Sequence, residues 1–144
     1  MTSFVDTNVL IDILQPEATH HEWSRNALEQ ARAAGPVFVS DAVYSEFTVT
    51  MESVSEASEV LATLNLARCG YSDKVLFDAG KAYAEYRKNK GTKSNVLPDF
   101  FIGALAAEES APLLTRDPAK VRTYFPSVQL VTPGPADSSI AESN

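Results

Sequence analysis

The sequence contains very little cysteine, very little histidine and no long hydrophobic run. Cys69 is the single cysteine among 144 residues, which excludes an internal disulfide and favours a reducing compartment such as the cytoplasm. No apolar run approaches the roughly 20 residues of a membrane span, and the N-terminus shows no basic-then-apolar signal pattern. His20 and His21 are adjacent, so they cannot share a helix face as metal ligands, and we expect both at the surface.

Basic residues are scarce in the first part of the chain. Residues 1–59 contain ten acidic and two basic residues, whereas residues 60–144 contain nine acidic and ten basic ones, which gives a net charge of −7. This balance argues against a generally basic nucleic-acid-binding protein, but phosphate contacts need only a local patch. Four basic residues lie within residues 86–93. They form either such a patch or an ordinary solvated helix end, where positive charge complements the helix dipole.

The spacing of apolar residues predicts short buried strands that alternate with amphipathic helices. This pattern indicates one α/β domain, at residues 1–132, with a parallel sheet covered on both faces. Residues 133–144 are small, polar and acidic, and are predicted to be disordered. The predicted strands cover residues 3–6, 37–39, 112–115 and 128–131. A first helix is predicted after a cap at Thr7 or Asn8. Another is predicted after a cap at Ser40 or Asp41, with an apolar stripe that extends to Met51. Further helices are predicted over residues 22–33, 55–67, 72–86, 98–108 and 118–124.

Four acidic residues each lie in a short motif beside or inside an apolar segment. A lone carboxylate in such surroundings is costly unless its charge is compensated. A hard divalent cation with oxygen ligands, Mg²⁺ or Mn²⁺, compensates several carboxylates at once. The motifs are Phe-Val-Asp-Thr-Asn at Asp6, Tyr-Ser-Glu-Phe at Glu46, Leu-Pro-Asp-Phe-Phe at Asp99 and Leu-Thr-Arg-Asp at Asp117. The set indicates a metal-dependent enzyme that acts on phosphate esters.

Each acid also has an ordinary structural explanation. Asp6 could terminate a strand, and Glu46 could extend from a helix border into solvent. Asp99 could complement a helix dipole, and Asp117, which precedes a proline, could be an N-cap. However, all four map to the same end of the predicted parallel sheet, where ligand crevices form. A shared site is therefore the stronger interpretation.

The order and separation of these motifs resemble the PIN-domain ribonucleases, and among them the VapC-type toxins of toxin–antitoxin pairs. The resemblance covers about residues 3–132 and rests on residues 4–12 (Phe-Val-Asp-Thr-Asn-Val-Leu-Ile-Asp), 45–47 (Ser-Glu-Phe), 98–104 (Pro-Asp-Phe-Phe-Ile-Gly-Ala) and 113–117 (Leu-Leu-Thr-Arg-Asp), closing with Tyr-Phe-Pro at 124–126. It implies a three-layer α/β/α sandwich with a mainly parallel sheet. It also implies Mg²⁺- or Mn²⁺-dependent endonuclease activity on RNA, a homodimer and a bound VapB-like antitoxin.

Carried over by motif, Asp6, Glu46, Asp99 and Asp117 correspond to the acidic quartet of that family. For cleavage by a metal-activated water, we expect Asp6 and Asp99 to be direct metal ligands. Asp117 would bind through water or hold a second ion. Glu46 would orient the attacking water or act as its base.

Four further residues are expected around the quartet. Asn8 and Thr115 cannot carry charge, so we expect them to hold the carboxylates in place rather than to bind metal. Lys93 and Arg116 could contact the RNA backbone. Arg116 could equally form a salt bridge inside the acidic cluster, and the sequence does not decide between the two.

The pattern also bears on three other kinds of protein. An aspartyl-phosphate phosphatase would need a second aspartate two residues after Asp6, where this chain has Asn8. A receiver domain would need paired acids after the first strand and an acceptor aspartate near the third, and neither is evident. A pure binding module, whose acidic pocket docks a basic partner, stays possible and would differ from an enzyme by failing to cleave RNA.

Overall fold

Five short strands form a fully parallel sheet in the order β3-β2-β1-β4-β5. The structure is a computed structural model and describes residues 1–89 and 96–134. Lys93 and most of the predicted tail, residues 135–144, therefore lie outside the described residues. The strands are β1 (Ser3–Val5), β2 (Val37–Ser40), β3 (Leu66–Cys69), β4 (Leu113–Leu114) and β5 (Leu130–Val131). The helices are α1 (Thr7–Leu14), α2 (His21–Ala34), α3 (Asp41–Phe47), α4 (Val54–Thr63), α5 (Asp73–Lys88), α6 (Leu97–Glu109) and α7 (Ala119–Tyr124).

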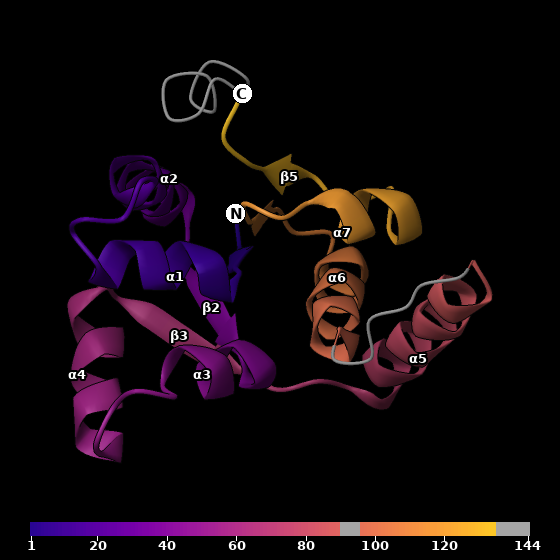
Figure 1. The fold of residues 1–144 in the computed structure, drawn as a ribbon, viewed down its shortest axis with the longest axis horizontal. Helices are drawn as coiled ribbons and strands as arrows, with labels where there is room; N and C mark the ends of the chain where they lie inside the picture. The colour runs from indigo at the N-terminus through magenta and orange to yellow at the C-terminus, as the bar shows by residue number, and fades with distance from the viewer. Residues whose placement is uncertain (90–95, 135–144) are drawn as a thin grey trace.

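The helices form two groups on opposite sides of the sheet. The chain runs from β1 through β2 to β3 and then returns past β1 to β4 and β5. Because parallel crossovers are right-handed, this reversal moves the second group of helices to the other face. Helix α1 packs against α2 and α3, and α6 packs against α5 and α7; Figure 1 shows α1–α4 on one side and α5–α7 on the other. The predicted α/β/α sandwich with a parallel sheet is confirmed.

Helix α6 is the most deeply buried helix of the second group. Its Phe100 is 0% exposed and lies against Tyr83, Tyr86, Tyr124 and Phe125, with ring centroids 5.5–6.4 Å apart. Such aromatic packing stabilises by burying large apolar surfaces in preferred edge-to-face geometries. It also fixes the first turn of α6, and with it the position of the preceding residue, Asp99.

Gly103 allows α6 to approach the segment that follows α7. A Cβ built on Gly103 would lie 2.6 Å from Cδ2 of Phe125. We expect Gly103→Ala to lower the free energy of unfolding by about 1–3 kcal/mol, because overpacking forces the ring out of its place. Urea denaturation measures this change. As the control, Gly80→Ala in α5 meets nothing within 4 Å and should stabilise by up to about 1 kcal/mol through helix propensity. Equal effects at the two glycines would contradict the packing argument.

The strand β3 was not predicted, and the predicted helix over residues 55–67 was too long. Helix α4 ends at Thr63, and Asn65 then adopts a φ of 55°, a left-handed conformation that stops a helix and reverses the chain. The strand that follows lies at the edge of the sheet, where Leu66 is buried but Ala67 and Arg68 are exposed. A short edge strand without an apolar run carries little signal in its sequence.

Two helix ends also differ from the prediction. Asp6, rather than Thr7 or Asn8, caps α1, because its carboxylate accepts a hydrogen bond from the first helical N–H. Helix α3 ends at Phe47, so Met51 lies beyond it. In the part of the chain that the structure describes, no helix combines the length and the apolar character that crossing a membrane requires.

Candidate active site

The candidate site lies where the chain leaves two neighbouring strands in opposite directions. Asp6 follows β1 and Thr115 follows β4, and these strands pair in parallel. The N–H of Asp6 donates to the carbonyl of Leu114 at 2.9 Å, which joins the two strand ends. The segments after β1 and β4 lead to helices on opposite faces, and in open parallel sheets this is the place where ligands bind.

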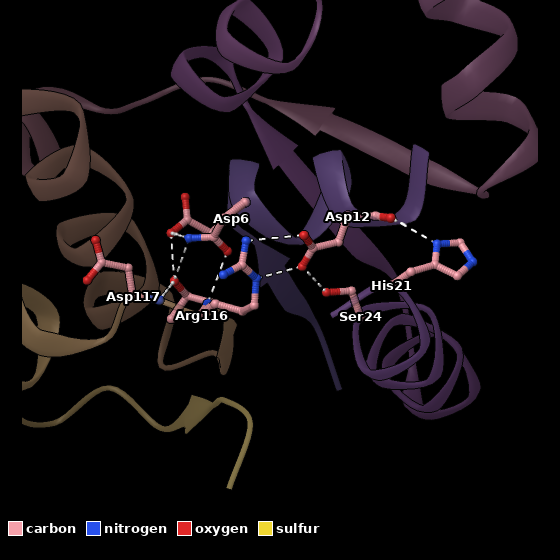
Figure 2. Close-up of polar contacts among 8 residues, drawn as sticks. Asp6, Asp12, His21, Ser24, Arg116 and Asp117 are labelled. Atoms are coloured by element: carbon pink, nitrogen blue, oxygen red, sulfur yellow. Dashed lines mark hydrogen bonds and ion pairs between the residues drawn. The ribbon is translucent and has the colours of Figure 1, made fainter. Parts of the chain in front are cut away.

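Asp6 is a partly buried carboxylate held by hydrogen bonds from both strand ends. Its Oδ1 accepts from the backbone N–H of Thr7 at 2.8 Å. Its Oδ2 accepts from the hydroxyl of Thr115 at 2.7 Å and, at a longer 3.5 Å, from Nδ2 of Asn8. Figure 2 shows Asp6 with dashed polar contacts around its side chain. Asn8 and Thr115 thus lie against the carboxylate that they were expected to orient.

Burial raises the pKa of Asp6 from its ordinary value of 3.8 to about 6. The hydrogen bonds from Thr115 and Thr7 oppose this increase, and the negative charges of Asp99 and Glu46 add to it. Like charges raise a carboxyl pKa only when they lie near it. Asp6, Glu46 and Asp99 therefore share one electrostatic environment.

The raised pKa of Asp6 predicts how the stability of the metal-free protein depends on pH. A carboxyl group with a higher pKa in the folded than in the unfolded state favours folding at low pH, and this advantage is lost as pH rises through the folded pKa. Between about pH 4 and 7, Asp6 should therefore reduce the free energy of unfolding by about 3 kcal/mol. Urea denaturation across this range should show the loss in the wild type and not in Asp6→Asn. Identical pH profiles for the wild type and Asp6→Asn would contradict the raised pKa of Asp6.

Glu46 is exposed on α3 and is joined to Asp6 through one residue. The hydroxyl of Thr7 donates to Oε1 of Glu46 at 2.5 Å, while the backbone N–H of the same threonine donates to Asp6. Thr7 therefore bridges the two carboxylates. Sequence reasoning treated Thr7 only as a helix cap, because nothing in its motif shows that α3 lies beside the start of α1.

Asp99, in the first turn of α6, pairs with a lysine that sequence reasoning missed. Nζ of Lys120 lies 3.4 Å from Oδ2 of Asp99, and the Lys120 side chain is only 21% exposed. The sequence predicted a helix at Lys120, but only the packing of α7 on α6 turns this lysine toward the acids. A positive charge thus already lies beside one carboxylate of the candidate site.

Asp117 is exposed and lies two residues after Thr115. Its backbone N–H donates to the Thr115 hydroxyl at 3.0 Å, so the same hydroxyl that binds Asp6 also positions Asp117. In the view of Figure 2 the side chain of Asp117 points away from Asp6. The backbone of Asp117 therefore belongs to the site, while its carboxylate is turned outward.

The donor chemistry of this edge of the sheet fits a hard divalent cation. Asp6, Glu46, Asp99 and Asp117 offer only carboxylate oxygens, the ligands that Mg²⁺ and Mn²⁺ prefer. Within residues 1–89 and 96–134, however, no three acidic, histidine or cysteine side chains lie close enough together to surround one ion.

Arg116 pairs with Asp12, which is not one of the four acids. Its Nε and Nη2 donate to Oδ2 and Oδ1 of Asp12 at 2.6 and 3.1 Å. Asp12 lies on α1 and also holds two residues of α2: Ser24 donates to Oδ2 at 2.7 Å, and Nδ1 of His21 lies 2.9 Å from the Asp12 carbonyl. His20 and His21 are both half-buried, so neither is the fully exposed surface residue that was expected. The sequence feature that could have revealed Asp12 is an acidic residue within a mostly apolar helix.

The PIN-domain family model matches residues 3–126, nearly the whole described chain. The chain belongs to the PIN-domain family. PIN domains are nucleases, which agrees with carboxylates gathered at the ends of parallel strands. No curated protein matches this PIN domain by sequence.

Solved structures, among them a toxin–antitoxin complex, share the fold of this PIN domain. VapBC2 from Rickettsia felis, bound to a promoter DNA fragment, matches with a TM-score of 0.70 and 19% identity, over 93% of this chain and 100% of that one. A toxin–antitoxin complex from Klebsiella pneumoniae matches with a TM-score of 0.65 and 25% identity, over 92% and 98%. FitAcB from Neisseria gonorrhoeae matches with a TM-score of 0.61 and 18% identity, over 92% and 97%. The PIN domain thus spans almost the full length of these relatives.

Proposed function

We propose that this PIN domain is a VapC-like toxin, a Mg²⁺- or Mn²⁺-dependent endoribonuclease that hydrolyses RNA phosphodiester bonds. The observation that carries the proposal is the environment of Asp6. This carboxylate is partly buried at the end of a parallel strand, Glu46 and Asp99 lie near enough to raise its pKa, and Thr7 links it to Glu46. Carboxylates arranged in this way are stabilised by a divalent cation and leave one acid free for proton transfer.

Asp6 and Asp99 would hold the ion directly, and Asp117 would bind it through water or hold a second ion. When bound, a divalent cation polarises the phosphoryl group and makes a water molecule more acidic. Nζ of Lys120 lies 3.4 Å from Oδ2 of Asp99. The ammonium would therefore have to move for this oxygen to bind the ion. Thr115 and Asn8 would keep the Asp6 oxygens in a fixed orientation toward the ion.

Glu46 would accept the proton of the attacking water. Its carboxylate is exposed, so substrate can reach it, and the Thr7 hydroxyl holds Oε1 in place at 2.5 Å. A positioned base of this kind contributes roughly 10²–10⁴-fold to a reaction rate. The remaining oxygen, Oε2, is the atom to which we assign the proton.

The proposal also includes partners and a compartment. A VapB-like antitoxin would neutralise the toxin, as the complexes similar in fold pair a toxin with an antitoxin. An arginine or lysine of such a partner could occupy the position that Lys120 holds beside Asp99, by charge-assisted bonding to carboxylates. We further propose a homodimer, a cytoplasmic location and an RNA backbone contact from Lys93.

Incubating the purified chain with total RNA, with and without Mg²⁺ or Mn²⁺, tests the function directly. We expect cleavage with either ion and none after chelation by EDTA, and sequencing of the new RNA ends would identify the target. Asp73→Asn, which removes an exposed acid at the start of α5, should cleave as the wild type does. If the metal-loaded chain leaves RNA intact but binds a basic peptide, the site is a docking pocket and the nuclease proposal fails.

A further inference from the structure

Asp12 is a buried carboxylate outside the proposed quartet. Its side chain is 5% exposed, and it lies on α1, whose N-terminus is capped by Asp6. Three hydrogen bonds reach its two oxygens: two from the Arg116 guanidinium and one from Ser24. Removing such a charge from water costs free energy, and an ion pair compensates this desolvation only when its geometry is good. Here both carboxylate oxygens are bonded, and the arginine contact is bidentate.

Arg116 lies between the two residues that carry the β4 side of the candidate site. Thr115, before it, donates to Asp6, and Asp117, after it, donates its N–H to the Thr115 hydroxyl. The backbone N–H of Arg116 itself donates to Oδ1 of Asn8 at 3.0 Å. Residues 115–117 therefore lie along α1 and contact it at three successive places, at Asp6, at Asn8 and, through the guanidinium, at Asp12. Figure 2 shows this row from Asp117 to Asp12.

The bond to Asp12 differs from the other two in strength and direction. The contact at Asp6 is one hydrogen bond, and the contact at Asn8 is two, the second of them 3.5 Å long. The contact at Asp12 is a charge-assisted pair of parallel bonds, which resists rotation as well as separation. A buried ion pair adds little net stability compared with apolar residues of the same volume. Its effect here is directional, because it determines where the backbone of residues 115–117 lies relative to α1.

We propose that Asp12 and Arg116 form a positioning pair that holds residues 115–117 on α1 and thereby sets the place of Thr115 and Asp117 relative to Asp6. The effect of this pair on activity rests on the proposed nuclease function, whereas its role in holding residues 115–117 on α1 does not. During catalysis the Arg116 guanidinium stays with Asp12 and does not bind RNA. Neither residue touches the reacting atoms, so both act through Thr115 and Asp117.

Single and double substitutions test the pair in the full chain with Mg²⁺. Asp12→Asn and Arg116→Met should each lower kcat by about 10–100-fold, the usual loss when a partner that orients a metal-binding residue is removed. KM for RNA should stay within about twofold. The double variant should lose no more than either single one, because the two residues act as a unit. A raised KM for Arg116→Met alone would assign Arg116 to the RNA and overturn the proposal.

Hydrogen exchange of the metal-free protein gives a readout that needs no activity. In Asp12→Asn, the amides of Arg116 and Asp117 should exchange at least about tenfold faster, since the segment they hold opens more often, while α5 amides keep their rates. Asp78→Asn, which removes an exposed ion pair with Lys74 in α5, should leave both amides unchanged. Unchanged exchange in Asp12→Asn would overturn the proposal. If the wild type fails to cleave RNA, the nuclease function fails, and this measurement still decides the positioning role.

An apolar replacement separates positioning from plain stability. Asp12→Leu combined with Arg116→Met should fold as well as the wild type, because apolar residues replace a buried ion pair without loss. We expect its melting temperature to be preserved while kcat stays about 10–100-fold low. Recovery of wild-type kcat in this variant would show that the pair serves stability alone. The variant also covers the case in which Asp12→Asn does not fold.

Discussion

Replacing Asp6 with asparagine is expected to lower the rate of RNA cleavage by about 10³-fold or more while the protein stays folded. Losing a metal-holding carboxylate removes several kcal/mol of transition-state stabilisation, and about 4 kcal/mol corresponds to three decades in rate. The fold should persist, because asparagine is also a good N-cap and the raised pKa shows that the Asp6 charge is costly in the metal-free state. Single-turnover cleavage of a labelled RNA and thermal denaturation measure the two effects.

The same experiment includes a variant at a second acid of the site and a control variant at an acid outside it. Glu46→Gln should lower cleavage by about 10²–10⁴-fold, as expected for a lost general base, and leave metal binding measured by calorimetry nearly unchanged. Asp73→Asn serves as the acid-to-amide control. If Asp6→Asn loses stability and keeps wild-type cleavage, Asp6 is a structural cap and the proposed site is wrong.

Cleavage is expected to leave 5′-phosphate and 3′-hydroxyl ends, with no cyclic phosphate. Cyclic phosphate forms when the 2′-hydroxyl of the RNA attacks, usually with histidine as acid and base. The chain has only His20 and His21, and His21 is held at the Asp12 carbonyl, away from the four acids. In the alternative route, water attacks in line and the 3′-oxygen leaves, which suits a carboxylate site that takes a divalent cation.

A substrate with one 2′-deoxy residue before the scissile phosphate distinguishes the two routes. Hydrolysis by water should still cut it, at a reduced rate where the 2′-hydroxyl contributes to recognition. Mass spectrometry of the products identifies the ends. Cyclic phosphate ends, or complete resistance of the deoxy substrate, would refute the water mechanism and leave Glu46 without its proposed role.

Most of the fold was predictable because its strands and helices carry strong local signals. The apolar runs at β1, β2 and β4 are buried on both faces of the sheet, and caps such as Ser72 and the proline near the start of α6 appear in the structure as expected. The edge strand β3 was missed because only its first residue, Leu66, is buried. Its position depends on pairing with β2, which no local pattern encodes.

The candidate site was predictable in its residues but not in its arrangement. Asp6, Glu46, Asp99 and Asp117 stand in recognisable motifs, and the parallel sheet required Asp6 and Asp117 to lie at one edge. Which side chain contacts which could not be derived from the motifs, since Thr7 bonds to Glu46 across 39 positions and Thr115 to Asp6 across 109.

The amino-acid sequence by itself determined the parallel α/β architecture, the family and the four acids, because apolar periodicity, caps and motif order are local properties of the chain. Only the tertiary structure decided the charge partners: Arg116 with Asp12, and Lys120 with Asp99. Coulomb interactions and hydrogen bonds act over a few ångströms whatever the separation along the chain. Their partners are therefore known only once the packing of α1, α6 and α7 brings distant residues together.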